Sequence, residues 1–524
     1  MFQHMPARIS LTISGAIALG AYEGGALAAL LYAIRPLAAG DDPAVVIDVM
    51  SGASAGSITA LLAARALQQG HDPEQVMAGA WVKKDRLGDL LAHNTDAPLS
   101  IASLRALGQT LLDPPGTPDP NRQLANIQLS YTIASLRGLE YQLARLGRDA
   151  VSSVTYVDYF DHVLKPATTP QELVGDGGRR ATAKWPLDAA LASAANAMGF
   201  PPYLLDRTAQ WQAYVDEGVD NLPPGKQMWY TDGGTIDNEP LGRTLDLTNR
   251  VDEGAGDDRR LHLLIHPHPT AATSAAHWAD PKLQPSFAQT AIRAFGLQRA
   301  QSLYRDLKQA EKTNSHIAWV ESMIARLGPE LDALPDANRA GVVTALRDTL
   351  NEINIAKTAF GGARSGATTS TTGASPSDLL DQVARAASGT GGKRAARIDV
   401  ISPLLLPEVA DGSHTVEQML SGEILFHFGG FLDETMRRND FDLGYRSTLE
   451  WLKSDGLAEL GLPKADTKRA VAAAQKAYTP RNGWKKTGGT TVGGVMLHHP
   501  WVTARLAAQL AKVLIHDLFH HPQP

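Results

Sequence analysis

The pattern that most constrains the fold is a unit of strand, small-residue turn and helix that occurs twice near the start of the chain. In the first copy, an apolar strand over 8–13 is followed by a glycine-containing turn and a helix of small and apolar residues over 24–34. In the second copy, the β-branched strand 45–50 leads through the turn 51–56 into an Ala- and Leu-rich helix over 57–67. Two such units in succession predict an α/β fold built on a sheet with parallel strands.

Four later segments also have the composition of short strands. Each is apolar and is bounded by polar or glycine-rich stretches, and together they cover 128–134, 228–231, 261–265 and 398–401. We expect them to extend the same sheet.

Helical and low-complexity stretches divide the rest of the chain. Over 285–355 the apolar residues recur at intervals of three and four, which is typical of amphipathic helices, whereas 361–393 has too few apolar side chains to form a core. The expected organisation is a catalytic core at 1–275, a helical insertion at 276–360, a flexible low-complexity loop with one or two helical turns at 361–395, a return to the core with amphipathic helices, such as 417–452, at 396–455, and a C-terminal helical extension at 456–524.

Composition excludes several classes of function. The 524 residues carry a formal net charge of −6, which gives no overall attraction to nucleic acid, and we expect no nucleic-acid partner. The chain contains no cysteine, so disulfides, thiolate metal sites and cysteine nucleophiles are ruled out.

The apolar run over 11–34 has the length of a signal peptide or a membrane span. Glu23 lies in the middle of this run, and glycines and serines interrupt it, so we interpret it as part of a globular core. The expected location is cytoplasmic, with peripheral contact to a membrane left open.

The segment Gly52-Ala53-Ser54-Ala55-Gly56 fits the nucleophile-elbow pattern G-x-S-x-G. In this motif a serine lies on a sharp turn between a strand and a helix, and the flanking glycines allow the backbone to close. The pattern alone is weak, but here an apolar strand precedes it and a helix follows it. Ser54 is therefore the candidate nucleophile.

A serine hydroxyl needs a base within hydrogen-bond reach to act as a nucleophile at neutral pH. Asp232 is the best carboxylate, because it follows a predicted strand directly and precedes two glycines, Gly233 and Gly234, that let backbone approach closely. Taken alone, an Asp-Gly-Gly sequence is more often a simple turn.

The turn over 14–20, between the first strand and the first helix, supplies a third element. Its backbone N–H groups and the dipole of the following helix would stabilise the negative oxygen of a tetrahedral intermediate. A nucleotide-binding loop is excluded, because no Lys-Ser or Lys-Thr follows Gly20 and the three-glycine dinucleotide spacing is absent.

In this order, the glycine-containing turn, G-x-S-x-G and Asp-Gly-Gly resemble the pattern of the patatin-like phospholipases. The segment 190–202 is similar to an Ala- and Ser-rich segment of that family, and 237–240 continues the Asp-Gly-Gly as family members often do. Residues 428–431, Arg437 and 442–444 are similar to the late part of bacterial members.

The resemblance covers roughly residues 8–270 and 397–452. It implies a three-layer α/β/α fold with a mostly parallel central sheet and added helical segments. It also implies hydrolysis of carboxylic ester bonds of lipids through an acyl-enzyme, by a Ser54–Asp232 dyad without histidine, metal or cofactor.

By the same resemblance, Gly15, Ala16 and Ile17 occupy the oxyanion hole. The family usually has three successive glycines and a cation in this turn, whereas this chain has Ala16 to Leu19 there, so oxyanion stabilisation would depend on backbone donors alone.

Two alternatives remain open. Ser54, Asp232 and His266 satisfy the chain order of a conventional Ser-His-Asp α/β-hydrolase. A non-catalytic lipid-binding or interaction module on the same fold is the other alternative, favoured if the altered turn cannot hold an oxyanion. His266 and His268 do not suggest a metal site, because no matching carboxylate cluster is evident.

The expected partner is a lipid or another acyl ester, with 87–112 and the helices after Pro285 as candidates for lipid contact.

Overall fold

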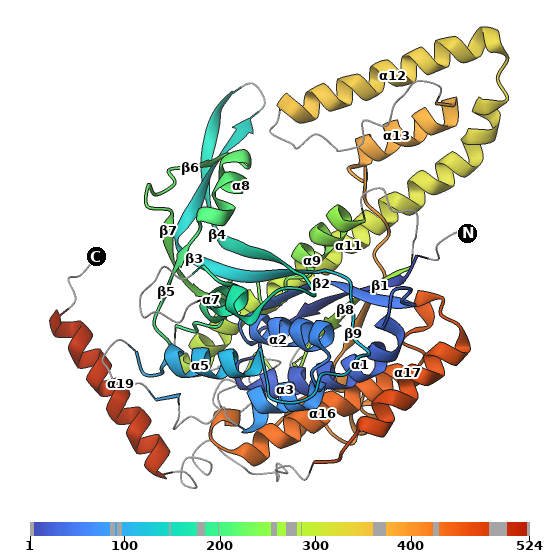
Figure 1. Cartoon of the computed structure of the whole chain (residues 1–524). Helices are drawn as coiled ribbons and strands as arrows, with labels where there is room; N and C mark the ends of the chain where they lie inside the picture. Colours follow the sequence, from blue (N-terminus) through green and yellow to red (C-terminus); the bar gives the residue numbers. More distant parts are fainter. Residues whose placement is uncertain are drawn as a thin grey trace.

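The computed structural model (Figure 1) describes most of the chain. The described residues are 5–83, 90–91, 97–145, 148–175, 184–197, 199–252, 259–268, 280–283, 286–359, 374–422, 429–481 and 500–520.

The strands form one sheet. In chain order they are β1 (Ala7–Ile13), β2 (Val45–Ala53), β3 (Ile127–Arg145), β4 (Arg148–Leu164), β5 (Tyr203–Asp206), β6 (Val219–Asp220), β7 (Gln227–Asp232), β8 (Arg260–Ile265) and β9 (Ile398–Ile401). The six strands predicted from the sequence are all present, whereas β4, β5 and β6 were not predicted.

The helices include long elements and single turns. The α-helices are α1 (Gly20–Ala38), α2 (Ala55–Gln69), α3 (Pro73–Ala78), α5 (Ile101–Leu111), α6 (Pro170–Val174), α7 (Pro186–Ser193), α8 (Trp211–Asp216), α9 (Leu241–Val251), α11 (Phe287–Asp332), α12 (Asp336–Ala359), α13 (Pro376–Ser388), α14 (Pro407–Ala410), α15 (Val416–Met419), α16 (Glu434–Lys453), α17 (Lys464–Ala477) and α19 (Pro500–His520). The 3₁₀ and π segments are η1 (Ile17–Leu19), η2 (Gly79–Lys83), η3 (Thr208–Gln210), η4 (Gly233–Thr235), η5 (Pro403–Leu405), η6 (Gly429–Phe431) and η7 (Ala458–Leu460).

The sheet has the strand order β5-β7-β3-β2-β1-β8-β9, and β4 and β6 also pair with β3. From β3 through β2, β1 and β8 to β9 every pairing is parallel. The pairings of β4, β6 and β7 with β3, and of β5 with β7, are antiparallel. The parallel half corresponds to the repeated strand-turn-helix units, because parallel neighbours require a crossover connection that is usually a helix.

The register brings the ends of four strands to one edge of the sheet. Ile13 at the end of β1 lies opposite Gly52 of β2 and Ile265 at the end of β8. Asp232 at the end of β7 lies opposite Ile133 of β3. The turns that follow these strands therefore meet at this edge.

Helices cover both faces of the sheet, which gives the predicted three layers (Figure 1). Helices α1 and α2 pack on one face, with α16 and α17 outside α1, and α9 covers the other face. The expected α/β fold with added helical segments is confirmed, but the sheet is mixed and not mostly parallel, because four of the eight pairings between the described strands are antiparallel.

Helix α1 is the central helix of the core. Together with the preceding turn, over Ile17–Ala38, it is long and apolar enough to cross a membrane, and 89% of its most apolar window is buried inside the protein. Within the fold, this stretch is buried as a core helix.

Two late segments differ from expectation. Within the predicted loop 361–395, Pro376–Ser388 is a helix of 13 residues, because Ser375 and Asp378 form a capping box and its apolar residues lie on one face; residues 360–373 lie outside the described part. Within 417–452, where a dense helix was expected, α15 ends at Met419 and α16 begins at Glu434.

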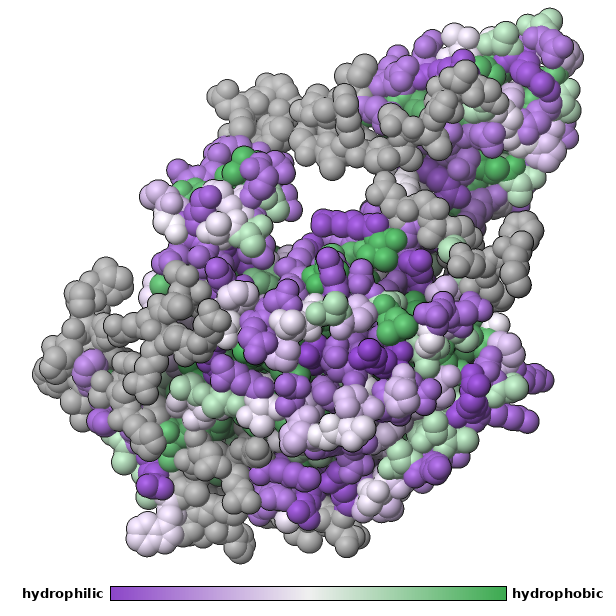
Figure 2. Space-filling model, in the orientation of Figure 1, coloured by the Kyte–Doolittle hydropathy of each residue, from purple (hydrophilic) through white to green (hydrophobic). Residues whose placement is uncertain are grey.

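Helices α11, α12 and α13 form an arm that extends from the body of the molecule (Figure 1). This arm contains most of the predicted helical insertion. On the face shown in Figure 2, the described residues are mainly hydrophilic, and the hydrophobic ones gather in small separate groups on the arm and the body. This face does not single out a lipid-contact surface, and part of the candidate segment 87–112 lies outside the described residues.

Helices α1 and α16 pack at backbone distance, and glycine makes this contact possible. A Cβ added at Gly25 would overlap the carbonyl oxygen of Phe441, and one added at Gly444 would overlap that of Tyr22. We expect Gly25→Ala to lower the free energy of unfolding by about 1–3 kcal/mol, because the helices would have to separate.

A matched control is Gly341→Ala on the exposed surface of α12, where an added Cβ meets no atom within 4 Å. This variant should gain roughly 0.5–1 kcal/mol from its better helix propensity. Urea denaturation of both proteins measures the difference, and equal effects would contradict the packing argument.

Candidate active site

Ser54 lies at the sharp turn between β2 and α2. Its backbone has φ 51° and ψ −125°, a conformation that a residue with a side chain rarely adopts. Gly52 and Gly56 allow this turn to close: a Cβ at Gly52 would lie 2.5 Å from the backbone of Gly56, and one at Gly56 would overlap the carbonyl oxygen of Ile13. The predicted elbow is therefore present, with Ser54 at its apex.

Asp232 contacts Ser54 directly. The Ser54 hydroxyl donates a hydrogen bond of 2.8 Å to Asp232 Oδ2, and the Gly234 amide donates one of 2.8 Å to Asp232 Oδ1. Both side chains are buried, with exposed fractions of 2% and 0%. A Cβ at Gly233 would overlap the carbonyl oxygen of Thr132, so the loop after Asp232 requires glycine to approach β3.

Ser193, the last residue of α7, braces the elbow. Its hydroxyl oxygen accepts a hydrogen bond of 2.8 Å from the Ser54 amide, and its hydroxyl group donates one of 2.6 Å to the carbonyl oxygen of Thr132. Ser57 Oγ lies 2.8 Å from the same hydroxyl. The Ala- and Ser-rich segment thus fixes the backbone of Ser54, a role that the sequence reasoning missed.

The turn after β1 lies beside Ser54. The Gly15 amide donates to the carbonyl oxygen of Asn238 (2.8 Å), and Asn238 Nδ2 donates to the carbonyl oxygen of Gly15 (3.0 Å). The Gly15 amide is therefore already used, which corrects its assignment as an oxyanion donor. A Cβ at Gly15 would overlap Asn238 Oδ1 and lie 3.1 Å from Ser54 Cβ, so its role is to allow close approach.

The next two amides of this turn remain candidates for oxyanion donors. Within the described residues, no hydrogen bond is found for the amides of Ala16 and Ile17, which precede the first intraturn bond from Leu19 to Ala16. Ile17 has φ 52°, an uncommon conformation for a β-branched residue. Backbone strain thus occurs on both turns that flank the site.

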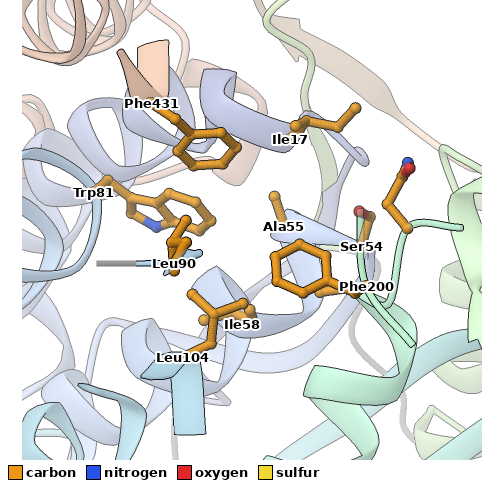
Figure 3. Close-up of a pocket in the computed structure, with 11 residues that line it drawn as sticks. Ile17, Ser54, Ala55, Ile58, Trp81, Leu90, Leu104, Phe200 and Phe431 are labelled. Carbon is orange, nitrogen blue, oxygen red and sulfur yellow. The ribbon is translucent and has the colours of Figure 1, made fainter. Parts of the chain in front are cut away.

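An apolar pocket opens beside Ser54 (Figure 3). Phe200, Ile58 and Leu104 lie along one side, and Phe431 and Trp81 lie across the pocket from Ser54. The lining residues are Ile17, Ser54, Ala55, Ile58, Trp81, Leu90, Leu104, Ala194, Asn196, Phe200 and Phe431.

Residues 11–245 match the model of a protein family described as patatin-like phospholipase. This part of the chain is a patatin-like phospholipase domain. The match supports lipid acyl hydrolase activity in general, and lipids as substrates.

Other comparisons add little to the family match. A search of curated proteins gave no match. A crystal structure of VipD from Legionella pneumophila is similar at 14% sequence identity, covering 99% of this chain and 93% of that one, with a TM-score of 0.20.

Beneath the oxyanion turn of this patatin-like domain lies a buried carboxyl group, Glu23. Burial raises the pKa of Glu23 well above its ordinary value, and the nearby charge of Glu239 adds a smaller shift in the same direction. Hydrogen bonds from Thr59 and Ser14 act in the opposite direction. A protonated Glu23 would carry no charge under the site. Its placement in the core agrees with the interpretation of 11–34 as a globular segment.

His266 follows β8 at the same edge of the sheet. It is buried, its Nδ1 has no hydrogen-bond partner in the described part of the chain, and burial, with a smaller effect of His268, lowers its pKa to about 4. Because Ser54 donates directly to Asp232, His266 does not lie between them as a Ser-His-Asp triad requires. The described residues contain no group of three or more His, Asp or Glu that could hold a metal ion.

We expect Ser193→Ala to lower the free energy of unfolding by about 1–3 kcal/mol, because the buried Ser54 amide and the Thr132 carbonyl would lose their partners. Reaction of Ser54 with a phosphonate should also slow, by about a hundredfold, as the hydroxyl shifts from its position. The control is Ser315→Ala on the exposed surface of α11. An unchanged labelling rate in Ser193→Ala would contradict the bracing role.

Burial, followed by the charge of Asp306, raises the pKa of Asp237 to about 7. An unfolded aspartate ionises near pH 4, so between about pH 4 and 7 the native state binds more protons than the unfolded state. This group's contribution to the free energy of unfolding therefore falls as pH rises through that window. Asp237→Asn should lose less stability than wild type between these pH values in urea denaturation.

The control for this prediction is Asp216→Asn, which changes an exposed aspartate on α8. A wild type and an Asp237→Asn variant with the same pH dependence would show that Asp237 does not retain its proton in the native state.

Proposed function

We propose that this domain hydrolyses carboxylic ester bonds of lipids through a Ser54–Asp232 dyad and an acyl-enzyme. The observation that carries the proposal is the hydrogen bond of 2.8 Å from the Ser54 hydroxyl to Asp232 Oδ2. A carboxylate at this distance is in position to accept the serine proton as the oxygen attacks.

In the first half of the reaction, Ser54 Oγ attacks the acyl carbonyl carbon while its proton passes to Asp232 Oδ2. The amides of Ala16 and Ile17 stabilise the negative oxygen of the tetrahedral intermediate. Collapse breaks the ester bond, and Asp232 returns the proton to the departing alcohol. Water then attacks the acyl-enzyme by the same route, which releases a carboxylic acid and restores Ser54.

Oxyanion stabilisation in this domain relies on backbone donors. Leu19 is fully buried and carries no charge. The positive end of α2, which begins directly after Ser54, adds to the field at the reacting carbon. Preorganised amide donors of this kind are worth roughly 3–4 kcal/mol each in acyl-transfer enzymes.

Two observations bear on the alternatives. The direct Ser54–Asp232 contact favours a dyad over a triad that includes His266. The strained backbone at Ser54 favours an active enzyme over a binding module, because strain of about 1–3 kcal/mol per residue persists mainly where function requires it.

We further propose that the protein is cytoplasmic and meets its substrate by peripheral contact with a membrane. Lipid esters reside in membranes, and the pocket beside Ser54 is lined mainly by apolar side chains suited to an acyl chain.

The test is hydrolysis of a panel of short and long acyl esters and phospholipids by wild type, Ser54→Ala and Asp232→Asn. Both variants should remain folded and lose at least about a thousandfold in kcat/KM, because the nucleophile or its base is removed. Labelling by a serine-reactive phosphonate should be confined to Ser54 and absent in Ser54→Ala.

The matched control is His266→Ala, which should retain turnover. Loss of turnover in His266→Ala together with full activity in Asp232→Asn would support the triad instead. A wild type that neither hydrolyses any ester nor reacts with the phosphonate would support the binding module.

A further inference from the structure

The pocket beside Ser54 has an aromatic wall opposite the nucleophile. In Figure 3, the indole of Trp81 and the ring of Phe431 lie across the pocket from Ser54. An acyl chain attached to Ser54 Oγ and directed into this pocket would run toward these two rings.

Trp81 occupies a seat that two glycines of α1 leave open. A Cβ at Gly20 would lie 2.5–2.7 Å from three atoms of the six-membered ring of Trp81, and one at Gly24 would lie 2.9 Å from its Cδ1. Gly20 and Gly24 are one helical turn apart, so they lie on the same face of α1. The helix therefore accommodates the indole flat against its backbone.

The backbone that carries Trp81 is also unusual. Trp81 lies in η2, a π-helical segment of a kind often found at functional sites. The indole is only 6% exposed, which indicates that it is packed firmly in this position.

One buried cation contacts the two backbone segments that carry Trp81 and Phe431. Arg437 on α16 is fully buried, and its Nε and Nη2 donate to the carbonyl oxygen of Val82 at 3.1 and 2.9 Å. Its Nη1 donates to the carbonyl oxygen of Gly430 at 2.7 Å. Trp81 and Phe431 are the chain neighbours of Val82 and Gly430. The guanidinium therefore holds the backbone at both aromatic residues in place.

The space in front of the wall is small. The pocket is open on one side and has a volume of about 40 Å³, whereas a cavity that holds one benzene molecule measures roughly 150 Å³. Trp81 and Phe431 are held by packing on glycine and by a buried guanidinium. We therefore expect them not to move aside for a longer acyl chain.

We propose that Trp81 limits how far an acyl chain can extend into this pocket and so makes the enzyme prefer esters of shorter acyl chains over those of longer ones. The inference rests on the proposed hydrolysis at Ser54 and specifies its substrate class. Trp81 acts through the volume it occupies and takes no part in the chemical steps.

The experiment compares kcat/KM for p-nitrophenyl butanoate and p-nitrophenyl dodecanoate. Wild type should prefer butanoate by at least about tenfold, because even one methylene that does not fit a pocket can cost about that factor. Trp81→Ala should reduce this preference by about tenfold or more, and Trp81→Phe should lie between them. Trp319→Ala on the exposed surface of α11 is the matched control and should keep the wild-type ratio.

A wild type without chain-length preference, or a folded Trp81→Ala with the wild-type ratio, would overturn the proposal. If Trp81→Ala does not fold, Trp81→Phe and the rates at which butyl and dodecyl phosphonates label wild-type Ser54 decide the question. Equal labelling rates would overturn the proposal.

A second measurement separates this inference from the proposed function. Binding of dodecanoate to Ser54→Ala needs no turnover, and it should strengthen at least about tenfold when Trp81→Ala is added and by a smaller factor when Trp81→Phe is added. If the Trp81 substitutions strengthen dodecanoate binding but wild type hydrolyses no ester, the role of Trp81 is supported and the proposed hydrolase activity is contradicted. If wild type hydrolyses esters but the Trp81 substitutions leave the dodecanoate affinity unchanged, the hydrolase activity is supported and the role of Trp81 is contradicted.

Discussion

The site depends on a backbone conformation at Ser54 that is unfavourable in isolation. A residue with a side chain in this region costs of order 1–3 kcal/mol, so its surroundings must hold it there. Three contacts hold it there. Gly56 packs against the turn after β1, the Ser193 hydroxyl oxygen accepts a hydrogen bond from the Ser54 amide, and Asp232 accepts one from the Ser54 hydroxyl group. The same constraints aim the hydroxyl at the pocket, so strain and orientation have one cause.

Much of this arrangement could be predicted from the sequence, because local patterns specified it. Strand-turn-helix units with β-branched strands fixed the parallel half of the sheet, and small residues at fixed spacing around Ser54 marked the elbow. Asp232 could be paired with Ser54 since it ends a strand and is followed by glycines that permit close approach. The direct contact between the two side chains agrees with that reasoning.

Other features depend on contacts between distant segments, which spacing does not reveal. The long β3–β4 hairpin, with strands of 19 and 17 residues, contains polar and charged residues that weaken the strand pattern. The use of the Gly15 amide by Asn238 and the bracing by Ser193 join segments more than 100 residues apart. Two glycines one turn apart in a helix, Gly20 and Gly24, indicate that another group packs closely there. The sequence does not indicate that this group is Trp81.

We infer that the turn after β1 and the elbow after β2 form one preorganised site for a tetrahedral acyl intermediate. The most direct measurement is a crystal structure of the protein after reaction with a phosphonate ester, whose phosphoryl oxygen mimics the oxyanion. We expect phosphorus bonded to Ser54 Oγ, with the phosphoryl oxygen about 2.7–3.2 Å from the amides of Ala16 and Ile17. Phosphorus on another residue, or a phosphoryl oxygen that points away from that turn, would contradict it.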